Sequence, residues 1–179
     1  MTEGISRRAL AAYAAGTAAG VALLGGVAEA AASTSDWLAT IKAQHQEIDR
    51  RLGMVRSATS PAARRAAFKA FANYLSAHSL AEETSVYPAI AITGSTPDAQ
   101  QLYHEQDDAE ILVARIDNKL AKGQDAEVSA LLDQLATALH AHVAEEETRK
   151  FPALRQSADA AMNAKITADF KATFARAVA

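Results

Sequence analysis

The 179-residue sequence contains no cysteine, and this absence excludes several kinds of site at once. A chain without thiols has no disulfides, thiolate zinc sites, iron–sulfur clusters or cysteine nucleophiles. Glycine (8 residues) and proline (4 residues) are also few, which favours helices. The net charge is only −3 and no basic stripe stands out, so nucleic-acid binding is not expected.

Half of the residues are apolar, although aromatic residues make up only 6%. This apolar fraction, together with the small net charge, is untypical of a disordered chain. The length suits one compact domain with its own core.

Residues 1–32 have the plan of an export signal. Arg7-Arg8 precedes an apolar stretch that ends at Val27, and Ala28-Glu29-Ala30 has the small residues of a cleavage site. The arginine pair resembles the twin-arginine (Tat) signal of bacteria. We therefore expect the Tat export machinery to recognise it, cleavage near residues 30–32, and a periplasmic or otherwise exported protein. An uncleaved membrane helix is the alternative, but four glycines make this stretch a poor anchor.

Residues 33–179 carry a helical pattern throughout, with apolar residues at intervals of three and four. Four helices joined by short links predict an all-α fold, an up-down-up-down four-helix bundle. A tail helix from about Asp159 to Val178 adds a C-terminal element to the bundle. The expected bundle helices run from Thr34-Ser35 to about Arg56, from Ser60-Pro61 to an end or break at Pro88, from about Pro97 to Lys122, and from Asp125 to about Phe151-Pro152.

Polar residues interrupt the apolar stripes of these helices. Each predicted bundle helix carries a histidine followed four residues later by a carboxylate. Residues at this spacing share one helical face and lie about 6 Å apart. Four such pairs pointing inward would gather four imidazoles and four carboxylates around one point. The pairs are His45 with Asp49, His78 with Glu82, His104 with Asp108, and His142 with Glu146.

This arrangement predicts a metal site, because burying several carboxylates without cations costs several kcal/mol each. By the same reasoning, the metal-free protein is expected to lose stability above about pH 5, where the carboxylates ionise together. A single histidine on an apolar stripe is more often an ordinary core residue. Four pairs on four stripes favour the metal interpretation instead.

An internal repeat supports a pair of metal ions. The segment His78-x-x-x-Glu82-Glu83-Thr84-x-x-Tyr87-Pro88 recurs 64 residues later as His142-x-x-x-Glu146-Glu147-Thr148-x-x-Phe151-Pro152. The two halves therefore look like two copies of one helical hairpin. A pseudo-twofold between them would place their ligands on opposite sides of a dinuclear centre.

Imidazole and carboxylate ligands without sulfur suit iron, manganese or zinc, and a dinuclear centre favours iron. No histidine has a glutamate three residues before it, so the ferritin-like ligand pattern is disfavoured. His140 lies about 200° around its helix from His142, which predicts a surface or rim position. Competition by His140 as a ligand is the alternative on this helix.

These residues resemble the hemerythrin-like, HHE cation-binding family over roughly Ser35 to Leu154. The resemblance implies a four-helix bundle with a non-haem di-iron centre. The four histidines of the pairs would be terminal ligands, Glu82 a bridging carboxylate and Glu146 its counterpart. Oxygen-carrying members have a second histidine where this chain has Asp108. They also have an aspartate five residues after the fourth-helix histidine, whereas Glu146 follows at four. These two departures from the family's pattern make the site poorer in histidine and richer in carboxylate. Carboxylates stabilise the ferric state, which favours redox chemistry, peroxide handling or iron holding over reversible oxygen carriage.

Several functions remain open at this point. One is an exported protein that binds two iron ions, with zinc or manganese as substitutes, and a ligand such as dioxygen, nitric oxide or peroxide. Another is a di-iron oxidase or peroxidase acting on a small molecule. Tyr74, Tyr87 and Tyr103 are candidates for its polar group beside the metal, with simple packing as the alternative. The third is a structural bundle that forms a homodimer through its tail helix.

Overall fold

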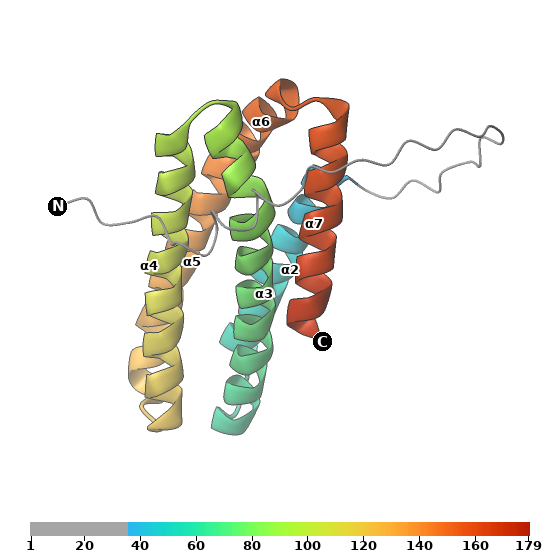
Figure 1. Cartoon of the computed structure of the whole chain (residues 1–179). Coiled ribbons are helices and arrows are strands. Elements are labelled where there is room, and N and C mark those ends of the chain that lie inside the picture. The colour runs from blue at the N-terminus through green and yellow to red at the C-terminus, as the bar shows by residue number, and fades with distance from the viewer. Residues whose placement is uncertain (1–35) are drawn as a thin grey trace.

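The structure is a computed structural model that describes residues 36–179, so the expected export signal lies outside the described residues. Those residues are helical and contain no strand, which confirms the all-α class. The helices pack side by side along their lengths (Figure 1). The elements are α2 (Trp37–Ser57), α3 (Pro61–Thr93), α4 (Thr96–Ala121), α5 (Asp125–Glu145), the π-helical segment η1 (Glu146–Lys150), α6 (Phe151–Ser157) and α7 (Ala160–Val178).

Side-chain caps set the starts of three long helices. Asp36, Ser60 and Ser95 each accept a hydrogen bond from the backbone N–H three residues on, which satisfies a donor that the first turn leaves free. The first helix thus begins after Asp36 rather than at Thr34-Ser35. After α4, Gly123 has a φ of 69°, a left-handed conformation that favours glycine and ends the helix.

The expected end or break at Pro88 was wrong, because α3 continues through this proline to Thr93. A proline inside a helix removes one backbone hydrogen bond and crowds the preceding turn. The residues on both sides of Pro88 are buried in the core, Val86 and Tyr87 before it and Ala89 and Ile90 after it. We infer that this burial outweighs the lost hydrogen bond and holds the helix together.

The core consists of two apolar clusters. The first cluster contains Leu75, Leu139 and other buried residues of α2, α3, α4 and α5. The second cluster includes Trp37, Phe151 and Phe170. Along α2, α3 and α4 the sequence passes from one cluster to the other, and after α5 it reaches the second cluster in α6. The residues at the crossing are buried but polar, and they form a layer between the clusters: His45 on α2, His78 on α3, Gln106 on α4 and His142 on α5.

Helix α7 packs against α3 and α2 (Figure 1). Ile166 and Phe170 are buried in the second cluster, and the indole N–H of Trp37 donates to Asn163 over 2.9 Å. Most of the apolar stripe expected on the tail helix therefore packs against other helices of the same chain, whereas Val178 at its end is 49% exposed.

Among the described residues, none of the helices has the length and hydropathy that a membrane crossing needs.

Candidate metal centre

Five ligand-type side chains meet in the polar layer between the two apolar clusters. His45 comes from α2, His78 and Glu82 from α3, His142 from α5, and Glu146 from the first position of η1. Both glutamates are fully buried, with 0% exposure. They form two groups that could each hold a metal ion and that share one member: His45, His78 and Glu82, and Glu82, His142 and Glu146.

The Nε2 atoms of all three histidines face these two carboxylates. His78 Nε2 lies 3.3 Å from Glu82, and His142 Nε2 lies 3.2 Å from Glu146. His45 Nε2 lies between both glutamates, 3.3 Å from Glu146 and 3.7 Å from Glu82. Each carboxylate is therefore close to two imidazole nitrogens.

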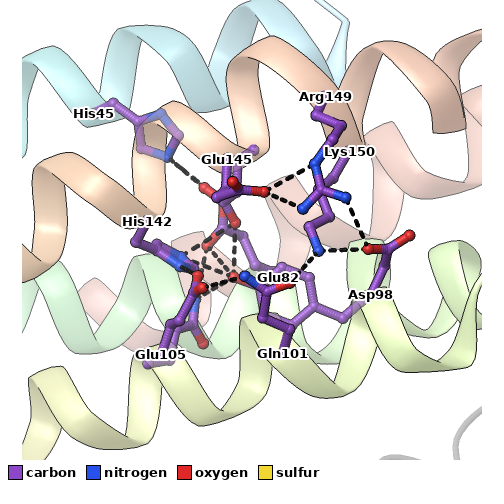
Figure 2. Close-up of polar contacts among 12 residues, drawn as sticks. His45, Glu82, Asp98, Gln101, Glu105, His142, Glu145, Arg149 and Lys150 are labelled. Carbon is purple, nitrogen blue, oxygen red and sulfur yellow. Dashed lines mark hydrogen bonds and ion pairs between the residues drawn. The ribbon is translucent and has the colours of Figure 1, made fainter.

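The other ring nitrogen of each histidine, Nδ1, forms a hydrogen bond with a residue outside the cluster. The Nδ1 atoms of His45, His78 and His142 each lie 2.8 Å from an acceptor oxygen, on Glu147, Gln44 and Glu105 respectively. Since these oxygens only accept, each Nδ1 donates, and the Nε2 lone pair of a neutral ring is left for a metal ion. Figure 2 shows Glu105 beside His142, next to Glu82.

Sequence reasoning missed these three outer residues as parts of the site. Only Glu147 carried a signal, because it belongs to the internal repeat. Gln44 and Glu105 each stand beside a histidine in the sequence, and that position alone does not distinguish them from surface residues.

Two further polar groups bind the carboxylates. The hydroxyl of Tyr87 donates to Glu146 over 2.7 Å and lies 3.2 Å from Glu82, whereas the amide nitrogen of Gln106 donates to Glu82 over 2.8 Å. Of the three candidate tyrosines, Tyr87 is thus the one whose hydroxyl lies in the cluster. Tyr103 donates to the backbone carbonyl of Glu83, and the ring of Tyr74 stacks under an arginine.

The centre retains buried polar atoms without hydrogen-bond partners. Among residues 36–179 these include His45 Nε2, Glu82 Oε1 and Glu146 Oε2. These three atoms face one another, with His45 Nε2 3.3 Å from Glu146 and 3.7 Å from Glu82, so a cation held among them would satisfy all three. The donor set, three imidazoles and two carboxylates, therefore fits a metal ion of the iron, manganese or zinc type.

A comparison with protein-family models agrees with this site. Residues 37–154 match the model described as the hemerythrin HHE cation binding domain. The chain belongs to the hemerythrin HHE cation-binding domain family. No curated protein and no solved structure matches the chain.

The segment η1 distinguishes the second copy of the internal repeat of this hemerythrin-type domain from the first. Residues 146–150 form a π-helix, in which the Phe151 N–H donates to the Glu146 carbonyl, whereas the matching part of α3 is α-helical. Such one-turn π segments often occur at functional sites. The buried Lys150 ends the segment and donates to Asp98 over 2.6 Å and to Gln101 over 2.8 Å (Figure 2). These bonds tie η1 to the start of α4.

The structure does not bring three of the predicted site residues to the centre. Asp49 is exposed and pairs with His140 over 3.1 Å, and His104 and Asp108 are exposed on α4. Their expected inward orientation is therefore wrong. Successive helical residues are rotated by about 100°, so Gln106, which does point inward, lies about 200° from His104. For the five predicted residues that the structure brings together, the role as metal ligands stays a prediction.

The buried histidines change the expected charge of the metal-free centre. Burial alone would lower the pKa of His45, but Glu146 and Glu82 raise it to about 10. Burial would also lower the pKa of His142, but nearby carboxylates, Glu146 above all, raise it to about 9. Burial would raise the pKa of Glu82, yet His78 and His45 hold it well below its usual range. At neutral pH, two imidazolium groups therefore compensate the two buried carboxylates.

This pairing predicts a pH dependence that differs from the expected loss of stability above about pH 5. A histidine whose pKa is raised on folding stabilises the protein fully below its unfolded value of 6.5. The stabilisation is lost only as the pH rises through about 9 to about 10, the values in the folded state. The metal-free protein is thus expected to remain folded at neutral pH.

Two histidine substitutions test which helices supply ligands. We expect His142→Ala to weaken metal binding by more than about tenfold, since it removes an imidazole that faces Glu146. The exposed His104→Ala is the matched control and should retain its metal content, measured by elemental analysis after dialysis. A loss of metal in the His104 variant would show that α4 supplies an imidazole after all.

Metal binding to the metal-free protein should release protons. A ligating imidazole must be neutral, so the charged His45 and His142 lose about two protons per chain at pH 7 when metal enters. Calorimetric titrations with Zn²⁺ in two buffers of different ionisation enthalpy measure this number. A binding enthalpy that is the same in both buffers would contradict the proposed charge state.

Proposed function

We propose that this hemerythrin-type domain is an exported non-haem di-iron protein that binds a small ligand such as dioxygen, nitric oxide or peroxide at its metal centre. The observation that carries this proposal is that Glu82 is shared by two groups of ligand-type residues. A carboxylate shared by two such groups is placed as a bridging ligand of a dinuclear centre would be, and one oxygen of Glu82 has no hydrogen bond in residues 36–179. Support for the metal site itself comes from the family and from the buried cluster.

In this proposal His45, His78 and Glu82 hold one ion, and His142, Glu146 and Glu82 hold the other. Bound iron would supply a redox couple and an exchangeable coordination position. The protein contributes the rest: Glu147, Gln44 and Glu105 orient the imidazoles, and the two apolar clusters exclude water. Zinc and manganese are expected to bind to the same residues.

We also propose that the four helices of the bundle follow an up-down-up-down order.

A di-iron oxidase or peroxidase is the second candidate. One contact favours it: the hydroxyl of Tyr87 is fully buried and lies 2.7 Å from Glu146 and 3.2 Å from His142. A proton-bearing group at this place could support chemistry on a ligand. Nothing comparable identifies an organic substrate, so binding of a small ligand is the function that we prefer.

Export, with the Tat machinery as partner, and a periplasmic location follow from the sequence of residues 1–32 and remain proposals. A homodimer through α7 would have to use its outer face, because Ile166 and Phe170 are occupied within the chain.

Iron reconstitution tests the dinuclear centre. We expect two iron ions per chain after anaerobic loading with Fe²⁺, and an absorption spectrum that changes when air or peroxide is added. Because the ions bind only the folded state, the melting temperature should rise with metal and fall again with a chelator. A stoichiometry of one in a fully folded sample would disprove the shared role of Glu82.

The export proposal has a separate test. Replacing Arg7-Arg8 with Lys-Lys should stop export and leave a folded precursor inside the cell, because the Tat pathway recognises the arginine pair whereas general secretion needs only positive charge. Fractionation and N-terminal sequencing measure location and cleavage. Normal export of the Lys-Lys variant would show that another pathway carries the protein.

A further inference from the structure

Helix α4 contributes an amide, Gln106, to the polar layer where the other three helices contribute histidines. Gln106 is only 4% exposed. Its nitrogen donates to Glu82 over 2.8 Å and to the Tyr87 hydroxyl over 2.6 Å. Since an ionised carboxylate only accepts hydrogen bonds, the contact with Glu82 fixes which end of the amide is the nitrogen.

The other end of this amide has no hydrogen-bond partner. Gln106 Oε1 is a buried acceptor to which no group in residues 36–179 donates. Natural proteins rarely leave a buried carbonyl oxygen in this state, because its lost hydration is not replaced. The arrangement therefore indicates a partner that is not part of the polypeptide.

Gln106 lines a small cavity. It has a volume of about 20 Å³, and its other lining residues include His45, His78 and His142, the polar Ser79, Glu105 and Glu110, and aliphatic side chains such as Leu75 and Leu139. Glu82 and Tyr87, to which the amide nitrogen points, do not line it. The nitrogen is thus turned away from the cavity, which leaves the carbonyl oxygen as the end of Gln106 that faces it.

We propose that this cavity binds one small protic molecule and that the carbonyl oxygen of Gln106 accepts its hydrogen bond. The molecule is water at rest and hydrogen peroxide when that ligand is present. This inference rests on the proposed function and narrows its ligand class. Gln106 is then a specificity-determining residue.

Size and hydrogen bonding both restrict the ligand. A cavity of about 20 Å³ exceeds the roughly 10–15 Å³ that one water needs, but it leaves no room for an aromatic or other organic substrate. Dioxygen and nitric oxide carry no hydrogen and would leave Gln106 Oε1 unsatisfied. Water and hydrogen peroxide can each donate a hydrogen bond to Gln106 Oε1. The cavity should therefore bind them about tenfold more tightly than a ligand without a hydrogen atom, which is the effect of one hydrogen bond.

The decisive variant is Gln106→Met, which keeps the size of the side chain and removes the amide, both its carbonyl oxygen and its donors to Glu82 and Tyr87. Leu132→Met, which changes a buried apolar residue of the first cluster that does not line the cavity, is the matched control. In iron-loaded protein with equal metal content, two quantities are measured: the second-order rate constant for the spectral change with hydrogen peroxide, and the affinity for nitric oxide. We expect Gln106→Met to lower the peroxide rate constant about tenfold and to leave nitric oxide affinity within about twofold. The control should change neither.

Measuring both the peroxide rate constant and the nitric oxide affinity distinguishes a loss of selectivity for peroxide from a general loss of ligand binding. If the peroxide rate and the nitric oxide affinity fall together, Gln106 acts through Glu82 and Tyr87 and the proposal is wrong. An unchanged peroxide rate would also overturn it.

A second measurement needs no metal and no variant. A high-resolution crystal structure of the metal-free protein should show a water within about 2.7–3.2 Å of Gln106 Oε1. An ordered structure in which this oxygen has no neighbouring water would overturn the proposal. If iron-loaded protein binds no ligand at all, the proposed function fails, while the crystallographic result still decides whether the cavity holds a protic molecule.

Discussion

The burial of two carboxylates is the constraint on which the rest of this structure depends. Glu82 and Glu146 have no exposed surface, and apolar clusters lie above and below them. An isolated buried carboxylate would be too costly to retain, so positive charge and hydrogen-bond donors must surround it. His45, His78 and His142 supply the imidazoles and Tyr87 and Gln106 supply the neutral donors. One oxygen of each glutamate is without a hydrogen bond in residues 36–179 and faces His45 Nε2, so either a proton on His45 or a metal ion can lie between them.

The sequence predicted much of this layer because α3 and α5 keep a simple geometry there. His78 and Glu82 continue the stripe of Phe71 and Leu75, and the 64-residue repeat pointed to the matching pair on the other half. Helical periodicity also predicted the bundle and the tail helix. It did not predict the helix through Pro88, since local propensity opposes it and only the burial of the neighbouring residues supports it.

Helix α4 shows why the remaining site residues could not be predicted. The face expected to carry His104 and Asp108 inward continues to Ile111, which is 57% exposed. The buried residues of α4 are Ala99, Leu102, Gln106, Ala109, Ile116 and Leu120, and the polar Gln106 and the small Ala109 interrupt the apolar pattern of this face next to the site. The π-helical turn is likewise invisible in the sequence, because Glu146 to Pro152 repeats Glu82 to Pro88 closely while its backbone differs. The π-helical turn ends at Lys150, which contacts Asp98, a residue distant in the chain, whereas the matching Val86 of α3 is apolar.

The outer acids complete the charge arrangement of the centre. Glu105 and Glu147 are part-buried and accept the Nδ1 protons of His142 and His45. Together with Glu82 and Glu146 they give four negative charges, which equal the charge of two divalent cations held by neutral imidazoles. Without metal, the two protonated histidines offset the inner pair, while Glu147 of the outer pair lies 3.5 Å from Lys42. The same side chains thus suit either two protons or two ions in the interior, and the neutral amide of Gln106 leaves this balance unchanged. A carboxylate at that position would shift it, which is a physical reason for an amide on α4 beside the ligand cavity.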